Sequence, residues 1–472
     1  PRVCAIAALT EMFLEKAYCS HDLAQLETDV LEIGHGCIAE AFGLALEAYD
    51  AQLLKDRPKD LKVHDIRSRS LATEIGDVSF SIRRYRDAFG CDVYLLADAL
   101  DIPYGTRISP GAMDFLVEAA SHTSYTKSAK LLARHGSCVR PTTVMKCLCV
   151  AGKLCTEEDQ RAAYDLYECG VVPAAESAQK DLCMEADGTY FRVQRAPKNT
   201  PKRLEVKAMV AYTKKEIRNG KTRREGCVHH ARVGSPDELW CEAIASVVGK
   251  KYDLSKIESV HLGGDGERWC RDLGRYLPHT CVTFHLDPFH VNRAVMKCFD
   301  DSKLAWSVID VLNEGDKQEA IALLKAALEF SVARKKQTRE VISYLEGNID
   351  HIALDGPSLG TMESENQHLY GVRMDSFPCA WSITGASDMA RIISRRESKT
   401  ALPKLTRERS MGEKRCARRQ RKELAFYESY GTNPSKVLKS EGSGYLPPHQ
   451  VDTKKMDPGK AYCFHRAMAN IG

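Results

Sequence analysis

The 472-residue sequence contains no apolar run long enough to cross a membrane. Its longest candidates, such as GCIAEAFGLALEAY at 36–49, are interrupted by charge and fall short of the roughly eighteen apolar residues that a spanning helix needs. The apolar patch at the N-terminus soon meets Glu11, Glu15 and Lys16, so we expect no signal peptide. These absences argue against an integral membrane protein and predict a cytoplasmic protein with no membrane partner.

Paired cysteines and a strong net charge are also missing. None of the 18 cysteines forms a C-x-x-C pair, so we expect reduced, mostly buried thiols rather than a disulfide scaffold. A net charge of +4 does not by itself indicate nucleic acid. Positive charge is concentrated between 391 and 422, where thirteen Lys or Arg stand against three Glu. Such a run is a solvated helix face, a disordered tail or a surface for phosphates.

The length and the 43% hydrophobic content allow more than one core. Apolar residues near a 3.6 period at 23–33 predict helix, whereas alternation at 78–82 and a Gly90 break before 93–96 predict a small hairpin. Residues 297–350 indicate two or three amphipathic helices. We therefore divide the chain into a helical arm at 1–65, a β-hairpin region at 66–104, a helical domain at 105–175, an α/β domain at 178–296 and 353–400, a helical insertion at 297–352 and a basic region at 401–472.

Three helix-length segments between 109 and 151 begin at capping residues, which are Ser109, Ser124 and Pro141. A Gly136 turn before the third segment is typical of a helix-turn-helix. Similar three-helix units also serve as packing modules, so both alternatives stay open. If the unit binds DNA, the side chains that could contact phosphates or base edges are those of Lys127, Lys130, Arg134, Arg140, Thr142 and Thr143.

From residue 180 onward the pattern predicts an α/β fold. Three strands joined by short connections come first, and then strand and helix alternate. This order describes a mixed five-stranded sheet whose first three strands are antiparallel, as in the ribonuclease H-like fold. The predicted strands are 181–194, 204–213, 226–233, 256–264 and 281–286, with helices from 236 and at 267–276.

Two Asp-Gly pairs begin at Asp187 and Asp265, and the acidic cluster MESENQH follows with Glu363 and Glu365. An Asp-Gly pair between apolar segments is a strong hairpin signal, so each pair could be only a turn. However, Asp187 falls on the first predicted strand and Asp265 ends the fourth. Carboxylates that converge from distant parts of a chain commonly bind the magnesium ions that act on phosphodiesters.

Several longer segments resemble those of a known protein family. In order, MEADGTYFRVQ, EVKAMVAYT, KIESVHLGGDGERW, FHLDPFHVNRAV and ESENQHLYGVRMDSFPCAWS resemble the ISLre-type bacterial insertion-sequence transposases, relatives of the Mutator-like DDE transposases. The upstream segments DVSFSIRRYRDAFGCDVYLLADAL and RISPGAMDFLVEAASHTSYTKSAKLLA look like the N-terminal blocks of that family, so the resemblance covers roughly 70–425. It implies a ribonuclease H-like catalytic core with an inserted helical subdomain, after a mainly helical N-terminal region that contains a helix-turn-helix.

The resemblance also implies an Asp-Asp-Glu site made by Asp187, Asp265 and Glu363, which would bind two Mg²⁺ or Mn²⁺ ions. Glu365 is the alternative third carboxylate, although the spacing to a following His and Arg-Met pair favours Glu363. The implied partners are double-stranded DNA, at terminal inverted repeats and at a target, and further copies of the chain in a dimer or higher multimer. The residues that would support the metal ligands are His285, Asp287, His290, Asn366, His368 and Arg373.

Two residues depart from the family pattern, because this chain has Asp375 and Phe377 after the Arg-Met pair where relatives usually read RMSSRP. Cys281, His285 and His290 could form a zinc site, but two clear ligand pairs are missing, so supporting roles are favoured. Phosphates would be neutralised by basic residues such as Lys198, Lys202, Arg203 and those of the 391–422 run.

We therefore expect a DNA transposase that cleaves strands at transposon ends and transfers them to target DNA. One alternative is a domesticated or inactive copy that binds DNA without cleaving it. Another is a ribonuclease H-like nuclease that cuts DNA and never joins ends. Terminal inverted repeats beside the gene would favour the transposase, because a mobile element must carry them.

Overall fold

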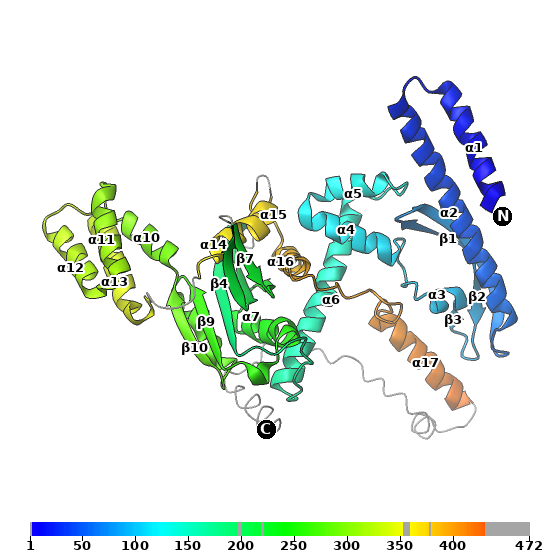
Figure 1. The fold of residues 1–472 in the computed structure, drawn as a ribbon. Helices are drawn as coiled ribbons and strands as arrows, with labels where there is room; N and C mark the ends of the chain where they lie inside the picture. Colours follow the sequence, from blue (N-terminus) through cyan, green and yellow to red (C-terminus); the bar gives the residue numbers. More distant parts are fainter. Residues whose placement is uncertain (1, 196–200, 219–220, 353–358, 377–378, 430–472) are drawn as a thin grey trace. The chain divides into compact units, whose positions relative to one another are not determined.

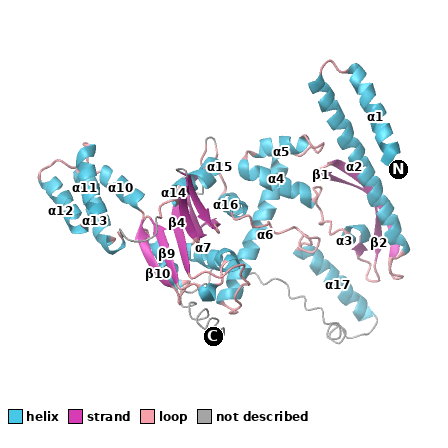
Figure 2. Ribbon diagram, viewed as in Figure 1, coloured by secondary structure: helices cyan, strands magenta, loops and turns pink. Residues whose placement is uncertain are grey.

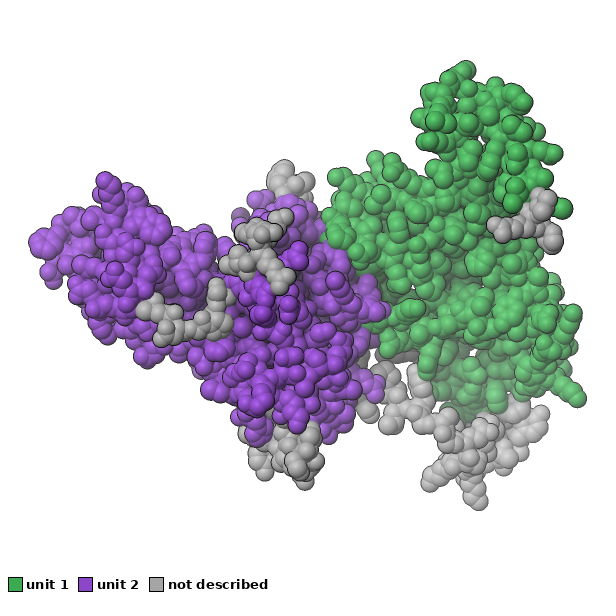
Figure 3. Space-filling view, viewed as in Figure 1, with its two compact units in different colours: residues 1–154, 403–450 green, residues 155–402, 451–472 purple. Residues whose placement is uncertain are grey.

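The computed structural model describes residues 2–195, 201–218, 221–352, 359–376 and 379–429 (Figure 1). They form two compact units, coloured separately in Figure 3. Unit 1 contains 2–154 and 403–429, and unit 2 contains the described part of 155–402. No helix in the described ranges is long and apolar enough to span a bilayer.

Unit 1 begins with two helices, α1 (Arg2–Cys19) and α2 (Leu23–Lys55), so the helix predicted at 23–33 is confirmed. Asp22 caps α2 by accepting a hydrogen bond from the Gln25 N–H at 2.8 Å. One face of α2 packs on an antiparallel hairpin of β1 (Lys62–Thr73) and β2 (Gly76–Arg86). Gly43 suits this contact, because a Cβ there would collide with the carbonyl oxygen of Ser79.

Two details of the predicted N-terminal region are wrong. Residues 62–65 belong to β1 and not to a helical arm. In place of a strand at 93–96 there is a two-residue strand, β3 (Asp92–Val93), followed by the helix α3 (Leu95–Ala99). A short apolar run has no period that separates strand from helix, so packing decides, and here Leu96 is buried against the hairpin core.

The three helices predicted between 109 and 151 are present as α4 (Pro110–His122), α5 (Tyr125–Ala133) and α6 (Pro141–Tyr167). Ser109 and Ser124 cap α4 and α5, accepting hydrogen bonds of 3.1 and 3.3 Å from the N–H groups three residues later. The first part of α6 belongs to unit 1 and the rest to unit 2. A further helix of unit 1, α17, covers Glu413–Ser429.

Unit 2 is built on a five-stranded mixed sheet with the order β10-β9-β4-β5-β8. Figure 2 draws the strands in magenta and labels β10, β9 and β4. β4, β5 and β8 are antiparallel neighbours, whereas β9 runs parallel to β4 and β10 parallel to β9. The predicted five-stranded sheet with three antiparallel strands first is confirmed. The strands are β4 (Asp181–Arg192), β5 (Arg203–Tyr212), β8 (Val228–Val233), β9 (Ser259–Gly264) and β10 (Cys281–Leu286).

The two faces of β4 have different chemistry. Leu182, Met184 and Ala186 point into the apolar core of unit 2. Successive side chains of a strand alternate between its two faces. Glu185 and Asp187 therefore lie on the opposite face. The core side is covered by α7 (Pro236–Glu242) and its π-helical continuation η1 (Ala243–Val248), which leads into α8 (Gly249–Lys251). The helix α16 (Ile383–Glu397) packs along β8.

A two-stranded ribbon between β5 and β8 was not predicted. It consists of β6 (Lys214–Arg218) and β7 (Lys221–Glu225), which pair antiparallel. The sequence contains the signal for it, since an Asn-Gly pair stands at 219–220 between two short charged segments. Charged rather than apolar alternation concealed the two strands.

Helices follow β10, and those predicted between 297 and 350 are present. After the short α9 (Arg268–Arg271) and η3 (Asp272–Arg275) and then β10 come α10 (Pro288–Met296), α11 (Ser302–Glu314), α12 (Lys317–Glu329) and α13 (Lys335–Gly347). These four helices pack on one another around Ile309, Leu324 and Leu345. The acidic cluster then forms α14 (Met362–Glu365), which continues through the π-helical η5 (Asn366–Gly371) into α15 (Val372–Met374).

Candidate metal centre

Asp187 lies inside a strand and not in a turn. It pairs with Ala208 of β5, and the next residue, Gly188, continues the same ladder. The interpretation of this Asp-Gly pair as a hairpin is therefore wrong. At the second pair the chain does turn, because Asp265 directly follows β9 and Gly266 has a φ of +92°.

Adjacent parallel strands bring the two pairs together. β4 and β9 are neighbours, with Glu185 opposite Gly263, so the residues that follow lie at the same end of the sheet. Asp187 and Asp265 line one small hollow there. Asp287 and His290, from the start of α10, line it as well.

Three side chains around this hollow have the spacing of a metal site. One ligand atom each from Asp187, His290 and Glu363 lies within 4.8 Å of the other two. The His290 Nε2 atom is 4.0 Å from Glu363 Oε2. The two carboxylates supply the oxygen ligands that Mg²⁺ and Mn²⁺ prefer, so Asp187 and Glu363 fit the predicted cofactor class, whereas the imidazole of His290 suits transition-metal ions better than Mg²⁺.

Asp265 stands at the edge of this group. Its Oδ1 atom accepts the Glu267 N–H at 2.8 Å and lies 3.7 Å from the Cys270 thiol. It is near enough for its charge to act on Asp187. The structure therefore brings Asp187 and Glu363 to ligand distance and leaves Asp265 on the wall of the same hollow.

Burial makes Asp187 an unusually weak acid. Asp187 is only 6% exposed, and this burial raises its pKa to about 6. The charges of Asp265 and Glu363 act in the same direction, whereas His290 and the Gly188 N–H oppose them. Burial also raises the pKa of Asp287, whose Oδ1 atom caps α10 by accepting the Phe289 N–H at 2.9 Å.

The two candidate third carboxylates point to different neighbours. Glu363 lies 3.7 Å from Arg293 and belongs to the group with Asp187. Glu365 pairs instead with Arg224, and its other oxygen is 3.5 Å from His229. Burial and the Arg224 charge lower the pKa of His229 to about 3, so this histidine is neutral and its contact with Glu365 is not an ion pair at neutral pH.

Of the residues expected to support the ligands, some lie at the site and some do not. Asn366 donates from Nδ2 to Asp187 Oδ2 at 2.9 Å, and Asp287 and His290 line the hollow. His285 pairs with His261 at 3.0 Å, His368 is exposed, and Arg373 stacks on Trp381 at 4.7 Å.

The zinc alternative is not supported by the geometry. Among the described residues, two groups of side chains reach metal-ligand distances, and neither contains Cys281 or His285. The reason is that His285 lies on β10 beside His261 of β9, whereas His290 lies in the first turn of α10 and is near Glu363.

Glu185 is a site residue that the sequence reasoning missed. Only 2% exposed, it accepts five hydrogen bonds, four of them from residues 360–362 just before and at the start of α14. A glutamate among the apolar residues of DLCMEADG was the available signal, because a lone buried acid in a strand requires partners.

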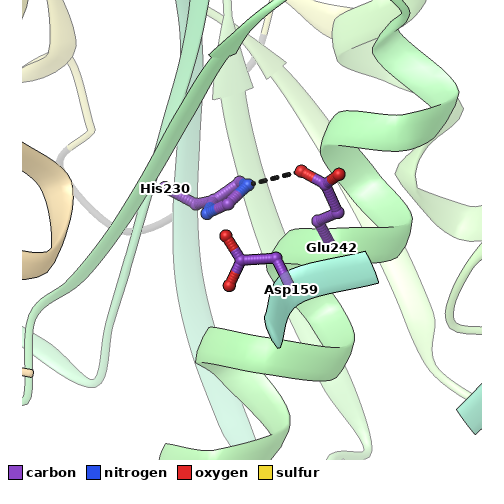
Figure 4. Close-up of side chains that lie close together, drawn as sticks. All are labelled: Asp159, His230 and Glu242. Atoms are coloured by element: carbon purple, nitrogen blue, oxygen red, sulfur yellow. Dashed lines mark hydrogen bonds and ion pairs between the residues drawn. The ribbon is translucent and has the colours of Figure 1, made fainter. Parts of the chain in front are cut away.

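The second group with metal-ligand spacing consists of Asp159, His230 and Glu242, all buried (Figure 4). His230 lies 3.2 Å from Glu242. Both carboxylates are held by Arg391, which donates to each at 2.6 Å. This group is therefore an ion-pair network in which a guanidinium occupies the place between the carboxylates.

The charges in this network stabilise one another. Burial alone would raise the pKa of Asp159 and of Glu242, but the neighbouring positive charges outweigh it and lower both pKa values. For Asp159 these charges belong to His230, Arg395 and Arg391, and for Glu242 Arg391 acts first.

The expectation that the basic run at 391–422 faces phosphates is therefore wrong for its first members. Arg391 and Arg395 are 2% and 7% exposed, because α16 turns them inward onto Asp159. Arg407 is buried too and pairs with Asp98. Exposed cations remain on α17, at Arg418, Arg419 and Arg421.

The other basic candidates vary in exposure. Arg203 pairs with Asp375 at 2.7 Å, so the departure from the family pattern supplies an ion pair. Lys202 is exposed, and Lys198 lies outside the described residues. In unit 1, Thr143 is half-buried and the other five DNA-contact candidates are exposed, namely Lys127, Lys130, Arg134, Arg140 and Thr142.

The raised pKa of Asp187 predicts a pH-dependent stability. The folded chain keeps a proton on this carboxyl up to about pH 6, whereas the unfolded chain loses it near pH 4, so stability falls as pH rises through that window. Asp187→Asn removes the titrating group. We expect the free energy of unfolding of Asp187→Asn minus that of the parent, measured in urea with a chelator, to rise by about 1–3 kcal/mol between about pH 4 and about pH 8.

Glu258→Gln is the control for this measurement, because its carboxylate is 65% exposed and pairs with the exposed Lys180. A stability difference between Asp187→Asn and the parent that stays constant across the pH range would contradict the assignment.

Removing Arg391 should be far more costly than removing an exposed arginine. Arg391→Leu leaves two buried carboxylates without their shared partner, so we expect the free energy of unfolding to fall by about 3–5 kcal/mol. The control is Arg275→Leu, whose side chain is 55% exposed and pairs with Asp272 at 3.6 Å, and it should cost less than about 1 kcal/mol. Equal losses in the free energy of unfolding for the two variants, measured by chemical denaturation, would show that the buried network stabilises the fold no more than an exposed ion pair does.

Similar sequences are known in bacteria. A UPF0236 protein of Caldanaerobacter subterraneus subsp. tengcongensis, TTE2489, is 25% identical over 404 residues, which cover 81% of this chain and 80% of the relative. Another from the same organism is 24% identical over 382 residues, 79% of this chain and 77% of the relative, and its name joins eleven designations from TTE0033 to TTE2212. The model of the Uncharacterised protein family (UPF0236) matches residues 19–415, and the chain belongs to this family.

Proposed function

We propose that this chain is a DNA transposase that cleaves DNA strands at the ends of a mobile element and joins them to target DNA in a reaction that requires divalent metal ions. The observation that carries the proposal is that Asp187 lies at metal-ligand distance from Glu363 and lines the same hollow as Asp265, at the ends of β4 and β9. These three residues come from segments that are far apart in the sequence.

The arrangement of the sheet supports a ribonuclease H-like core. Three antiparallel strands are followed by two parallel ones, with β4 at the centre of the order β10-β9-β4-β5-β8. The first carboxylate lies on the central strand, the second directly follows its parallel neighbour, and the third is on a later helix. This is the placement that the resemblance to ISLre-type transposases implies, with α11–α13, within 297–352, as the inserted helical subdomain.

The roles of the residues follow from their contacts. Asp187 and Glu363 would hold a divalent ion, with His290 as a further ligand and Asp265 as the carboxylate for a second ion. Asn366 orients Asp187 through its hydrogen bond to Oδ2. The bound ions would activate a water or a terminal 3′-hydroxyl and stabilise the leaving oxygen of the phosphodiester.

Unit 1 supplies a surface for DNA in this proposal. The helix α5, a Gly136 turn and the helix α6 follow one another in the order of a helix-turn-helix, and Arg140 just before α6 and Thr142 and Lys146 on it are exposed to solvent. A helix with this exposed polar face is suited to enter a major groove.

The names of the relatives add support. One relative's name joins eleven designations, which fits a sequence that is present in many copies in one genome. Many copies are what a mobile element leaves behind. A nuclease without joining activity, or a copy that only binds DNA, would use the same core, and DNA joining separates the three functions.

Substitution of the proposed ligands should abolish cleavage and joining but preserve end binding. We expect Asp187→Asn, Asp265→Asn and Glu363→Gln each to slow cleavage of DNA that carries the ends of the encoding element by more than about a hundredfold in Mg²⁺. Glu365→Gln should lose much less, because Glu365 pairs with Arg224 and lies outside the ligand group. Undiminished cleavage by Asp265→Asn, or equal losses for the two glutamates, would overturn the assignment.

The basic residues of unit 1 should control DNA affinity in a salt-dependent way. Lys130→Ala and Arg140→Ala should weaken binding to all DNA sequences, and each should reduce the slope of log affinity against log salt by about 1. Thr142→Ala should instead reduce the preference for the element ends over random DNA. Lys336→Ala, with a side chain 83% exposed on α13, is the matched control, and a slope change there equal to that of Lys130→Ala would argue against a DNA surface on unit 1.

A further inference from the structure

Glu185 is buried on the same face of β4 as Asp187, two residues before it. It has no arginine or lysine partner among the described residues, although a buried carboxylate is costly without one. The retained charge therefore calls for an explanation in terms of what it contacts.

What it contacts is the start of the helix that carries Glu363. One oxygen, Oε2, accepts three successive backbone N–H groups, from Gly360, Thr361 and Met362, at 3.0, 2.6 and 3.2 Å. The chain presents these groups together because Gly360 has a φ of +94°, a conformation that favours glycine. The first N–H groups of a helix have no partner within the helix, and a carboxylate satisfies them best.

The other oxygen, Oε1, accepts two hydroxyl groups. These are Tyr212 Oη at 2.6 Å and Thr361 Oγ1 at 2.8 Å. Burial and the Glu185 charge raise the pKa of Tyr212 far above its ordinary value, so its phenol keeps the proton that it donates. Five donors thus converge on one carboxylate, and four of them belong to residues 360–362.

The β6–β7 ribbon also holds the same segment. Lys215 on β6 donates to the Leu359 carbonyl at 3.2 Å. Arg224 on β7 donates to Thr361 Oγ1 at 3.1 Å and also pairs with Glu365. Thr361 is therefore shared between Glu185 and Arg224.

We propose that Glu185 is the positioning residue of the metal centre, because its carboxylate fixes the first turn of α14 and thereby sets Glu363 opposite Asp187 and His290. Arg224 completes this clamp through Thr361 and Glu365. The inference rests on the proposed function for its reaction readout, but the clamp itself can be tested without metal or DNA.

The first test measures hydrogen exchange in the full chain without metal. Glu185→Ala should raise the exchange rate of the amides at 360–362 at least about tenfold, because these amides lose their acceptor. Glu185→Gln should restore most of the protection, since its amide oxygen can replace Oε2 while its NH₂ donates to the two hydroxyls. Glu242→Gln is the control, a buried carboxylate of unit 2 that does not contact α14. Unchanged exchange at 360–362 in Glu185→Ala overturns the proposal.

The second test measures Mn²⁺ binding by calorimetry and DNA cleavage as a function of Mn²⁺ concentration. Glu185→Ala should weaken Mn²⁺ binding by about tenfold or more, and a higher Mn²⁺ concentration should recover much of the cleavage rate. Thr361→Val keeps the shape of the side chain and removes only the shared hydroxyl, so it should weaken Mn²⁺ binding by a smaller factor. This variant provides the test if Glu185→Ala fails to fold. The proposal is overturned if Thr361→Val binds Mn²⁺ as tightly as the parent and Glu185→Ala leaves the exchange at 360–362 unchanged.

The two proposals fail in different ways. If the parent chain neither binds Mn²⁺ nor cleaves DNA, the proposed function is wrong, while the exchange at 360–362 still decides whether Glu185 holds α14. If the parent is active and Glu185→Ala loses no more Mn²⁺ affinity than Glu242→Gln, the positioning role is wrong and the proposed function stands.

Discussion

Buried negative charge on β4 is the constraint on which the arrangement of unit 2 depends. Glu185 and Asp187 are 2% and 6% exposed, lie on one face and stand two residues apart. A carboxylate in such surroundings must be protonated, hydrogen-bonded on all sides or neutralised by a cation. Glu185 is fully hydrogen-bonded, and its donors fix the start of α14. Asp187 has two donors, from Gly188 and Asn366, and keeps a raised pKa.

The contrast with the Asp159 network indicates what Asp187 lacks. Around Asp159 and Glu242, guanidinium groups from Arg391, Arg395 and Arg232 neutralise the buried charge. In the part of the chain that the structure describes, no lysine or arginine forms an ion pair with Asp187. A divalent cation would therefore have to displace a guanidinium at the first group, but would relieve repulsion at the second. The same residue types thus stabilise the fold in one place and are suited to metal binding in the other.

Much of this arrangement could be predicted from the sequence, and the rest depends on packing. Apolar alternation and the order of the segments predicted the five strands, and Ser109 and Ser124 predicted helix starts, because these signals are local. The inward direction of Arg391 could not be predicted, since a run of charge looks the same on a buried face as on an exposed one. The role of Glu185 was also out of reach, because its partners lie about 175 residues further along the chain. The β6–β7 ribbon had a recognisable turn signal, but its strands have no apolar face to reveal them.

The choice between Glu363 and Glu365 follows from helix geometry once one contact is known. Asn366 donates to Asp187, so the face of the helix that carries Asn366 faces β4. At about 100° per residue, Glu363 lies only about 60° around the axis from Asn366, whereas Glu365 lies about 100° away on the other side and so meets Arg224. The sequence pattern of a glutamate three residues before an asparagine is therefore a physical signal. It places the proposed metal ligand Glu363 and the amide that donates to Asp187 on one face of the helix, and the proposed clamp at Glu185 fixes the height of that face above the strand.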